Sequence, residues 1–134
     1  MRRTSAAILL VAFTLGLAMV VAAGQRTTSS GGFSELHRAL LSRASSVELV
    51  MGLIERDGKS RSGRHHHPGG EFGFVLSGTI VVTAEHSPAE TLEAGDSFYQ
   101  PPGEWHAVST ATEGAKTVVF RVLKKGQPMV VAVD

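Results

Sequence analysis

From residue 47 onward, short apolar runs alternate with turn-forming residues. The clearest runs are VELVMGLI (47–54), EFGFVLS (71–77), TIVVTA (79–84) and KTVVFRVLK (116–124), all rich in β-branched or aromatic side chains. Gly, Pro and Asp separate them. Short strands at this spacing predict an all-β sandwich or barrel rather than alternating α and β units.

The strand predicted at residues 71–77 has two different faces. Its odd-numbered positions begin with Glu71 and carry small or polar groups, apart from one valine, whereas its even-numbered positions are Phe72, Phe74 and Leu76. If the first face looks into a barrel, the second needs a cover, because three large apolar groups together are too many for a wet surface. The cover could be the segment 36–41, the C-terminal segment 128–133 or a second subunit.

The first 24 residues have a different character. Arg2 and Arg3 precede a long uncharged apolar stretch that ends in small residues, a pattern typical of a secretory signal peptide cleaved near Gly24. The alternative is an uncleaved membrane anchor, since the stretch approaches the length that spans a bilayer. Residues 25–45 then predict a polar linker and an N-terminal arm, in which the leucines of segment 36–41 fit either a short helix or a strand.

Composition and charge narrow the possible functions. The 134 residues are enough for one domain with a hydrophobic core. The formal net charge is +1, and loss of Arg2 and Arg3 with a signal peptide would leave 11 basic against 12 acidic residues, with no basic stripe that indicates a nucleic-acid partner. Because the chain has no cysteine, any metal must be held by nitrogen and oxygen.

Three consecutive histidines are the most informative local feature. If the segment is extended, His65 and His67 project to one side with Cα atoms roughly 6.6 Å apart, while His66 points the other way. Glu71 has the same parity and follows a Pro-Gly-Gly bend, and His106 follows a Pro-Pro-Gly turn far along the chain. Together they predict a site for a divalent transition metal, Fe, Mn, Ni, Cu or Zn, with its identity open.

These residues also carry a family resemblance. Their spacing, and that of nearby glycines and a proline, resembles the two motifs of the cupin family, in particular small single-domain cupins with an RmlC-like jelly roll. The matching positions are His65, His67, Glu71 and Gly78 in the first motif and Gly95, Pro101, Gly103 and His106 in the second. The chain departs from the motifs at Gly58, one residue early, and at Thr110, where the family has asparagine.

The resemblance implies a double-stranded β-helix, or cupin jelly roll, over residues 46–124, followed by a C-terminal tail at 125–134. It implies that His65, His67, Glu71 and His106 are the metal ligands. Because cupins commonly pair through apolar sheet faces, it also favours a homodimer through the outer face of strand 71–77.

Other polar and aromatic residues are interpreted more simply. We expect His66, His37 and His86 to lie at the surface or rim. Asp96 and Glu104 could orient a ligand histidine or simply form turns. Tyr99 and Trp105 could line a pocket, although core packing is the first expectation for both.

Three imidazoles and one carboxylate leave an octahedral metal two open positions. That geometry permits oxygenase or oxidase chemistry or isomerisation. Together with the predicted signal peptide, it leads us to expect an exported, periplasmic or secreted, enzyme of one of these types that acts on a small molecule. The alternative is a non-catalytic binding or sensing module. An open pocket beside the metal favours the enzyme, and a plugged barrel favours the module.

Overall fold

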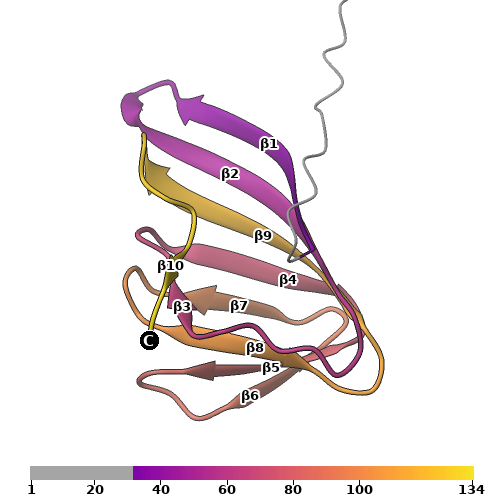
Figure 1. The fold of residues 1–134 in the computed structure, drawn as a ribbon. Coiled ribbons are helices and arrows are strands. Elements are labelled where there is room, and N and C mark those ends of the chain that lie inside the picture. Colours follow the sequence, from indigo (N-terminus) through magenta and orange to yellow (C-terminus); the bar gives the residue numbers. More distant parts are fainter. Residues whose placement is uncertain (1–31) are drawn as a thin grey trace, which may run out of the picture.

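Two five-stranded antiparallel sheets make up the described part of this computed structural model, residues 32–134 (Figure 1). The all-β jelly roll predicted from the sequence is confirmed. No helix occurs between residues 32 and 134, and hence none there is long and apolar enough to cross a membrane. The predicted signal peptide or anchor at 1–24 and the beginning of the linker lie outside the described residues.

The first sheet has the order β1-β2-β9-β4-β7. Its strands are β1 (Phe33–Leu41), β2 (Ala44–Arg56), β9 (Ala115–Lys124), β4 (Glu71–Ser77) and β7 (Ser97–Gln100). The second sheet has the order β10-β3-β8-β5-β6. Its strands are β10 (Val131–Ala132), β3 (His65–His66), β8 (His106–Thr110), β5 (Thr79–Ala84) and β6 (Glu90–Glu93).

The core lies between the sheets and follows the two-residue period of the strands. Alternate positions of β9 and β4 are buried, and their intervening positions are largely or partly exposed. The central cluster, against which Phe98 packs, consists of Val75, Ile80, Val82, Leu92, Val108 and Ala115. Burial of these apolar side chains supplies the main driving force for closing the sheets on each other.

Segment 36–41 belongs to a strand, so the helical alternative for it is wrong. β1 pairs with β2 from Phe33 opposite Ile54 to Leu41 opposite Ala44, with irregularities at two points. The leucine spacing resembled a helix because the register shift between Glu35 and His37 interrupts the two-residue period. The predicted arm is therefore an edge strand of the first sheet.

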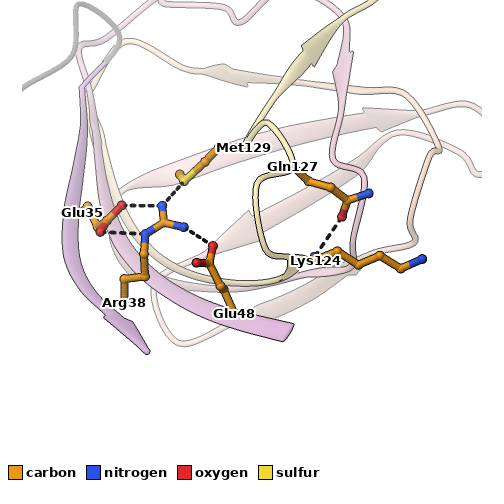
Figure 2. Close-up of polar contacts among 6 residues, drawn as sticks. All are labelled: Glu35, Arg38, Glu48, Lys124, Gln127 and Met129. Atoms are coloured by element: carbon orange, nitrogen blue, oxygen red, sulfur yellow. Dashed lines mark hydrogen bonds and ion pairs between the residues drawn. The ribbon is translucent and has the colours of Figure 1, made fainter. Parts of the chain in front are cut away.

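The C-terminal segment is also part of the fold. β10 adds to the edge of β3, with Val131 opposite His66 and Ala132 opposite His65. Figure 2 shows the segment that precedes β10. There the Arg38 guanidinium forms hydrogen bonds to both Glu35 and Glu48 and lies 3.3 Å from the Met129 sulfur. The side chain of Gln127 accepts a hydrogen bond from the Lys124 backbone in the same turn.

The outer face of β4 is apolar and exposed, as its alternation predicted. Phe72, Phe74 and Leu76 are 52%, 45% and 49% exposed, and Phe72 stacks against Tyr99 of β7 with ring centroids 4.6 Å apart. Within residues 32–134 neither proposed cover from the same chain reaches this face. β1 lies at the far edge of the sheet, and β10 belongs to the other sheet (Figure 1).

Candidate metal centre

Three histidine side chains converge between the sheets. His65 on β3 is the direct antiparallel partner of His106 on β8, and His67 follows one residue after β3. The ring centroids lie 4.4 Å apart for His65 and His106, 5.2 Å for His65 and His67, and 5.1 Å for His67 and His106. One ring nitrogen from each lies within 4.8 Å of the others, so the three could share an ion.

The loop that follows β7 helps to hold this arrangement. Gly103 adopts a φ of 79°, which favours glycine, and its backbone N–H donates to the carbonyl of His67 at 2.9 Å. The Pro-Pro-Gly turn that presents His106 is therefore bound directly to the histidine triplet. This hydrogen bond joins the segment that carries the first motif to the segment that carries the second.

Backbone carbonyls fix the ring orientation of two of the histidines. His65 Nδ1 lies 2.9 Å from the carbonyl of Gly63, and His67 Nδ1 lies 2.6 Å from the carbonyl of Met129. Because a carbonyl can only accept, Nδ1 carries a proton in both rings, so in the neutral imidazole the lone pair is on Nε2. This is the arrangement that metal-binding histidines adopt.

The chemistry of the cluster fits a metal. His67 Nε2 is buried and has no hydrogen-bond partner within residues 32–134. A buried nitrogen with a free lone pair is costly unless something binds it. A cation shared with His65 and His106 would satisfy that nitrogen.

Burial keeps two of the imidazoles neutral. It lowers the pKa of His67 to about 3, with a further contribution from the positive charge of Arg121. It also lowers the pKa of His106 to about 4, with a further contribution from His65. Both rings are therefore in the neutral form that metals require across the physiological pH range.

Glu71, the fourth predicted ligand, lies beside the histidines. Its carboxylate oxygens are 3.3 Å from His67 Nε2 and 3.9 Å from His106 Nε2. One of them also accepts a hydrogen bond from Arg121 Nε at 2.5 Å, in a pair with both side chains buried. The structure thus places Glu71 beside two of the three clustered histidines, although the group of ligand atoms that all lie within 4.8 Å of one another contains the histidines alone. It also adds a buried arginine that the motif did not include.

His66 turns away from the cluster, as strand parity predicted. It pairs with Val131 of β10 and is half-buried instead of lying free at the surface. His37 and His86 are exposed, as expected. The Asp96 side chain accepts a hydrogen bond from the Glu93 backbone, which gives it the turn-forming role.

The two aromatic residues near the second motif are not where they were expected. Tyr99 is 50% exposed on the outer face of the first sheet, so it is not a core residue. Trp105 is half-buried, and the guanidinium carbon of Arg64 lies over its ring, 4.4 Å from the ring centroid. Neither residue lines the space beside the histidines.

That space is open. Next to the histidines it holds about 30 Å³, room for one or two water-sized groups. It adjoins a larger cavity of about 300 Å³, and four residues line both spaces: Ile54, Arg56, His65 and Arg121. The barrel is therefore not plugged at the candidate metal centre.

Three contributors to the site escaped the motif comparison. Arg56 of β2 has the same parity as the buried Val50, and Arg121 of β9 has the same parity as the buried Val119. For both arginines the available sequence signal was a charged residue at a position where the alternation of the strand predicts burial. The Met129 carbonyl gave no signal, because a backbone group has no sequence signature.

A small molecule that entered the cavity would meet apolar walls, two guanidinium groups and the histidine cluster. A metal held by three imidazoles and a carboxylate would keep positions open for an oxygen ligand. The arrangement could support either chemistry on a small molecule or simple capture of it.

Comparisons with known proteins support the fold. The sequence model of the cupin domain family matches residues 53–123, more than half of the chain. No curated protein is similar enough in sequence to count as a relative.

Several solved structures resemble the chain. The DMSP lyase DddQ from Ruegeria pomeroyi has a TM-score of 0.60 at 24% identity, over 67% of this chain and 45% of the lyase. A conserved protein with a double-stranded β-helix domain from Klebsiella pneumoniae has a TM-score of 0.58 at 18% identity, over 81% of this chain and 90% of its own. The polyketide cyclase RemF from Streptomyces resistomycificus has a TM-score of 0.58 at 17% identity, over 77% and 72% of the two chains.

These likenesses concern the fold alone, since all three identities are below 25%. The chain also spans only about half the length of the DMSP lyases, 45% of one and 53% of another. The matched family model, the two antiparallel sheets and the histidine cluster nevertheless agree with one another. The chain is a member of the cupin family.

Proposed function

We propose that this cupin holds a divalent transition metal with His65, His67, Glu71 and His106 and acts on a small molecule beside it. The observation that carries the proposal is the buried Nε2 of His67, which has no hydrogen-bond partner in the described part of the chain and lies in a cluster with two further imidazoles. The carboxylate of Glu71, 3.3 Å away, completes a ligand set of nitrogen and oxygen.

The reaction we propose is of the oxygenase or oxidase type, with Lewis-acid isomerisation as the alternative. When bound, a redox-active metal would supply oxygen activation, and a redox-inert one would polarise a substrate oxygen. The open cavity of about 300 Å³ supports an enzyme over a plugged barrel.

The chain's own residues have separate roles in this proposal. Arg121 holds the Glu71 carboxylate in one orientation, and the Met129 carbonyl holds the proton of His67 on Nδ1. The apolar side chains of Ile80, Phe98 and Val108 line the inner space and exclude bulk water from it.

Elemental analysis of natively expressed protein tests the metal. We expect close to one equivalent of a transition metal per chain, followed by substrate-dependent oxygen uptake in a screen of small phenols, thiols and organic acids. Protein without metal that also fails to take up metal after chelation and dialysis would contradict the proposal.

A non-catalytic binding module is the second candidate, and one observation favours it. The Glu71 carboxylate already has a charged partner in Arg121, so the barrel interior is electrostatically satisfied at that position without a metal. Such a module would bind small molecules but show no turnover in the oxygen-uptake screen with metal present.

We further propose that the protein is exported and forms a homodimer. The apolar segment after Arg2 and Arg3 supports export, with a mature chain that starts near Gly24 or Gln25. N-terminal sequencing of the protein from the periplasm or medium tests this, and a retained Met1 in a membrane fraction would favour the anchor. The exposed apolar face of β4 supports the homodimer.

A further inference from the structure

We propose that Arg56 binds the carboxylate group of a small organic acid in the cavity beside the histidine cluster. This inference deepens the proposed function, on which it rests, because it names the chemical class of the small molecule.

Arg56 is placed to meet anything that enters the cavity. It continues the inward face of β2 after Val50, Gly52 and Ile54. It lines both the small space beside His65 and the larger outer cavity. A ligand that reached the histidines would therefore pass its side chain.

The guanidinium of Arg56 lacks a close partner. Among residues 32–134 no hydrogen bond or ion pair involves its side chain, although Glu71 exerts a longer-range attraction on it. Arg121, its neighbour in the cavity, is instead bound to the Glu71 carboxylate. A half-buried positive charge without a partner is unfavourable, so this group is available to an anion.

Burial lowers the pKa of Arg56, and Arg121 lowers it further, while Glu71 raises it. An arginine side chain nevertheless remains protonated in proteins. The cavity therefore keeps a fixed positive charge at Arg56.

The charges of the cavity favour a monoanion. Arg56 and Arg121 each carry one positive charge and Glu71 carries one negative charge, which leaves one positive charge without a counterion. A carboxylate, with one negative charge and two oxygens that match the guanidinium fork, balances it. Phosphate carries more negative charge than these protein groups neutralise.

The remaining walls favour an apolar body on the same molecule. Phe33, Ile54, Met129 and Val130 line the outer cavity, and most of its exposed lining is apolar. An organic acid with a short hydrocarbon part would bury that part against these side chains while Arg56 holds its carboxylate.

Hexanoate, its neutral isostere hexanamide and inorganic phosphate are suitable probes. Calorimetry at neutral pH would compare the full chain as isolated with the same protein after chelation. We expect the wild type to bind hexanoate in both forms and to prefer it to hexanamide. Arg56→Met should weaken hexanoate binding about 10- to 100-fold, as expected for loss of a charge-assisted hydrogen bond, and change hexanamide binding little.

Lys116→Met is the matched control. Lys116 is on the neighbouring strand, 56% exposed, and pairs with Glu55 outside the barrel, so its loss should leave hexanoate binding unchanged. If Arg56→Met does not fold, Arg56→Gln, which keeps a polar head without the charge, should show the same loss.

Equal hexanoate binding by the wild type and a folded, uncharged Arg56 variant would overturn the inference. Displacement of hexanoate by phosphate at lower concentration would overturn the carboxylate assignment. Metal content, measured on the same samples, separates this result from the proposed function. Protein that contains no metal as isolated, takes up none when metal is added, and still binds hexanoate through Arg56 would refute only the metal centre. Protein that contains metal but binds hexanoate equally well with and without the Arg56 charge would refute only the inference.

Discussion

Glu71 and Arg121 face each other across the neighbouring strands β4 and β9 and join through a 2.5 Å hydrogen bond in the interior of the barrel. Both side chains are at most 5% exposed. The carboxylate proposed as a metal ligand is therefore also one half of a buried ion pair, and its position does not depend on a metal.

This pairing predicts strongly coupled mutations. Arg121→Met should destabilise the fold by about 3–5 kcal/mol, because it leaves the Glu71 charge buried without its partner. Glu71→Gln alone should also destabilise the fold, and the double variant Glu71→Gln, Arg121→Met should lose less stability than the sum of the two single losses. Denaturant unfolding of the metal-free protein measures the free energy of unfolding of all three variants. Strictly additive losses would show that the two groups act independently.

Metal content should distinguish the inward histidines from their neighbour. His65→Ala, His67→Ala, Glu71→Ala and His106→Ala should each lose most of the bound metal, whereas His66→Ala should lose little. Elemental analysis after dialysis measures this. An equal loss in His66→Ala, or no loss in His106→Ala, would mean that the histidines act as a loose chelating loop.

Acid should destabilise the metal-free protein through its buried histidines. His67 and His106 have pKa values of about 3 and about 4 in the fold, whereas an unfolded histidine has a pKa of about 6.5. The unfolded state therefore binds more protons between these limits, so stability is complete above pH ~6.5 and falls as the pH drops toward the folded values.

Thermal melting at stepwise lower pH would show this loss. His67→Asn is the matched variant, because its amide can still donate to the Met129 carbonyl but does not titrate. Its melting temperature should depend less on pH in this range than that of the wild type. An identical slope would exclude His67 as a source of the acid sensitivity.

The C-terminal segment should contribute to metal affinity. Removal of residues 128–134 deletes the Met129 carbonyl that holds the His67 proton, and we expect about a 10- to 100-fold loss of affinity, typical of groups that orient a ligand. Met129→Leu keeps the carbonyl and should bind metal normally. Competition with a chelator of known affinity measures both, and unchanged affinity of the truncated chain would exclude this role.

The outer face of β4 should determine assembly. Sedimentation should show a dimer for the wild type and monomer or aggregate for Phe74→Glu, since a charge there would be buried against the partner. Thr91→Glu places the same charge on an exposed position of β6 and should remain dimeric. A wild-type monomer at micromolar concentration would contradict the interface.

The fold was predictable from local patterns. Alternation along segment 71–77 and the glycines at 78 and 95 predicted which face is buried and where the chain turns, and both glycines have positive φ. Segment 36–41 was ambiguous, because the irregularity near Leu36 removes the two-residue period on which a strand prediction depends.

The candidate site was predictable only in part. The spacing of the two motifs identified His65, His67, Glu71 and His106, because the side chains of ligands have a sequence pattern. It could not show that Arg121 pairs with Glu71, or that Arg56 has no hydrogen-bond or ion-pair partner within residues 32–134, since both facts depend on the register of β2, β9 and β4. Register arises from the packing of whole sheets, not from local spacing.

The hydrogen bond between His67 and Met129 has a consequence for how the protein is made. Its two ends are 62 residues apart, and a ribosome that adds about 5–20 residues per second needs several seconds to produce the second after the first. During that interval strands β4 to β9 are synthesised, but the His67 proton has no carbonyl to fix it on Nδ1. High-affinity metal loading therefore has to wait until residue 129 has been synthesised and has docked.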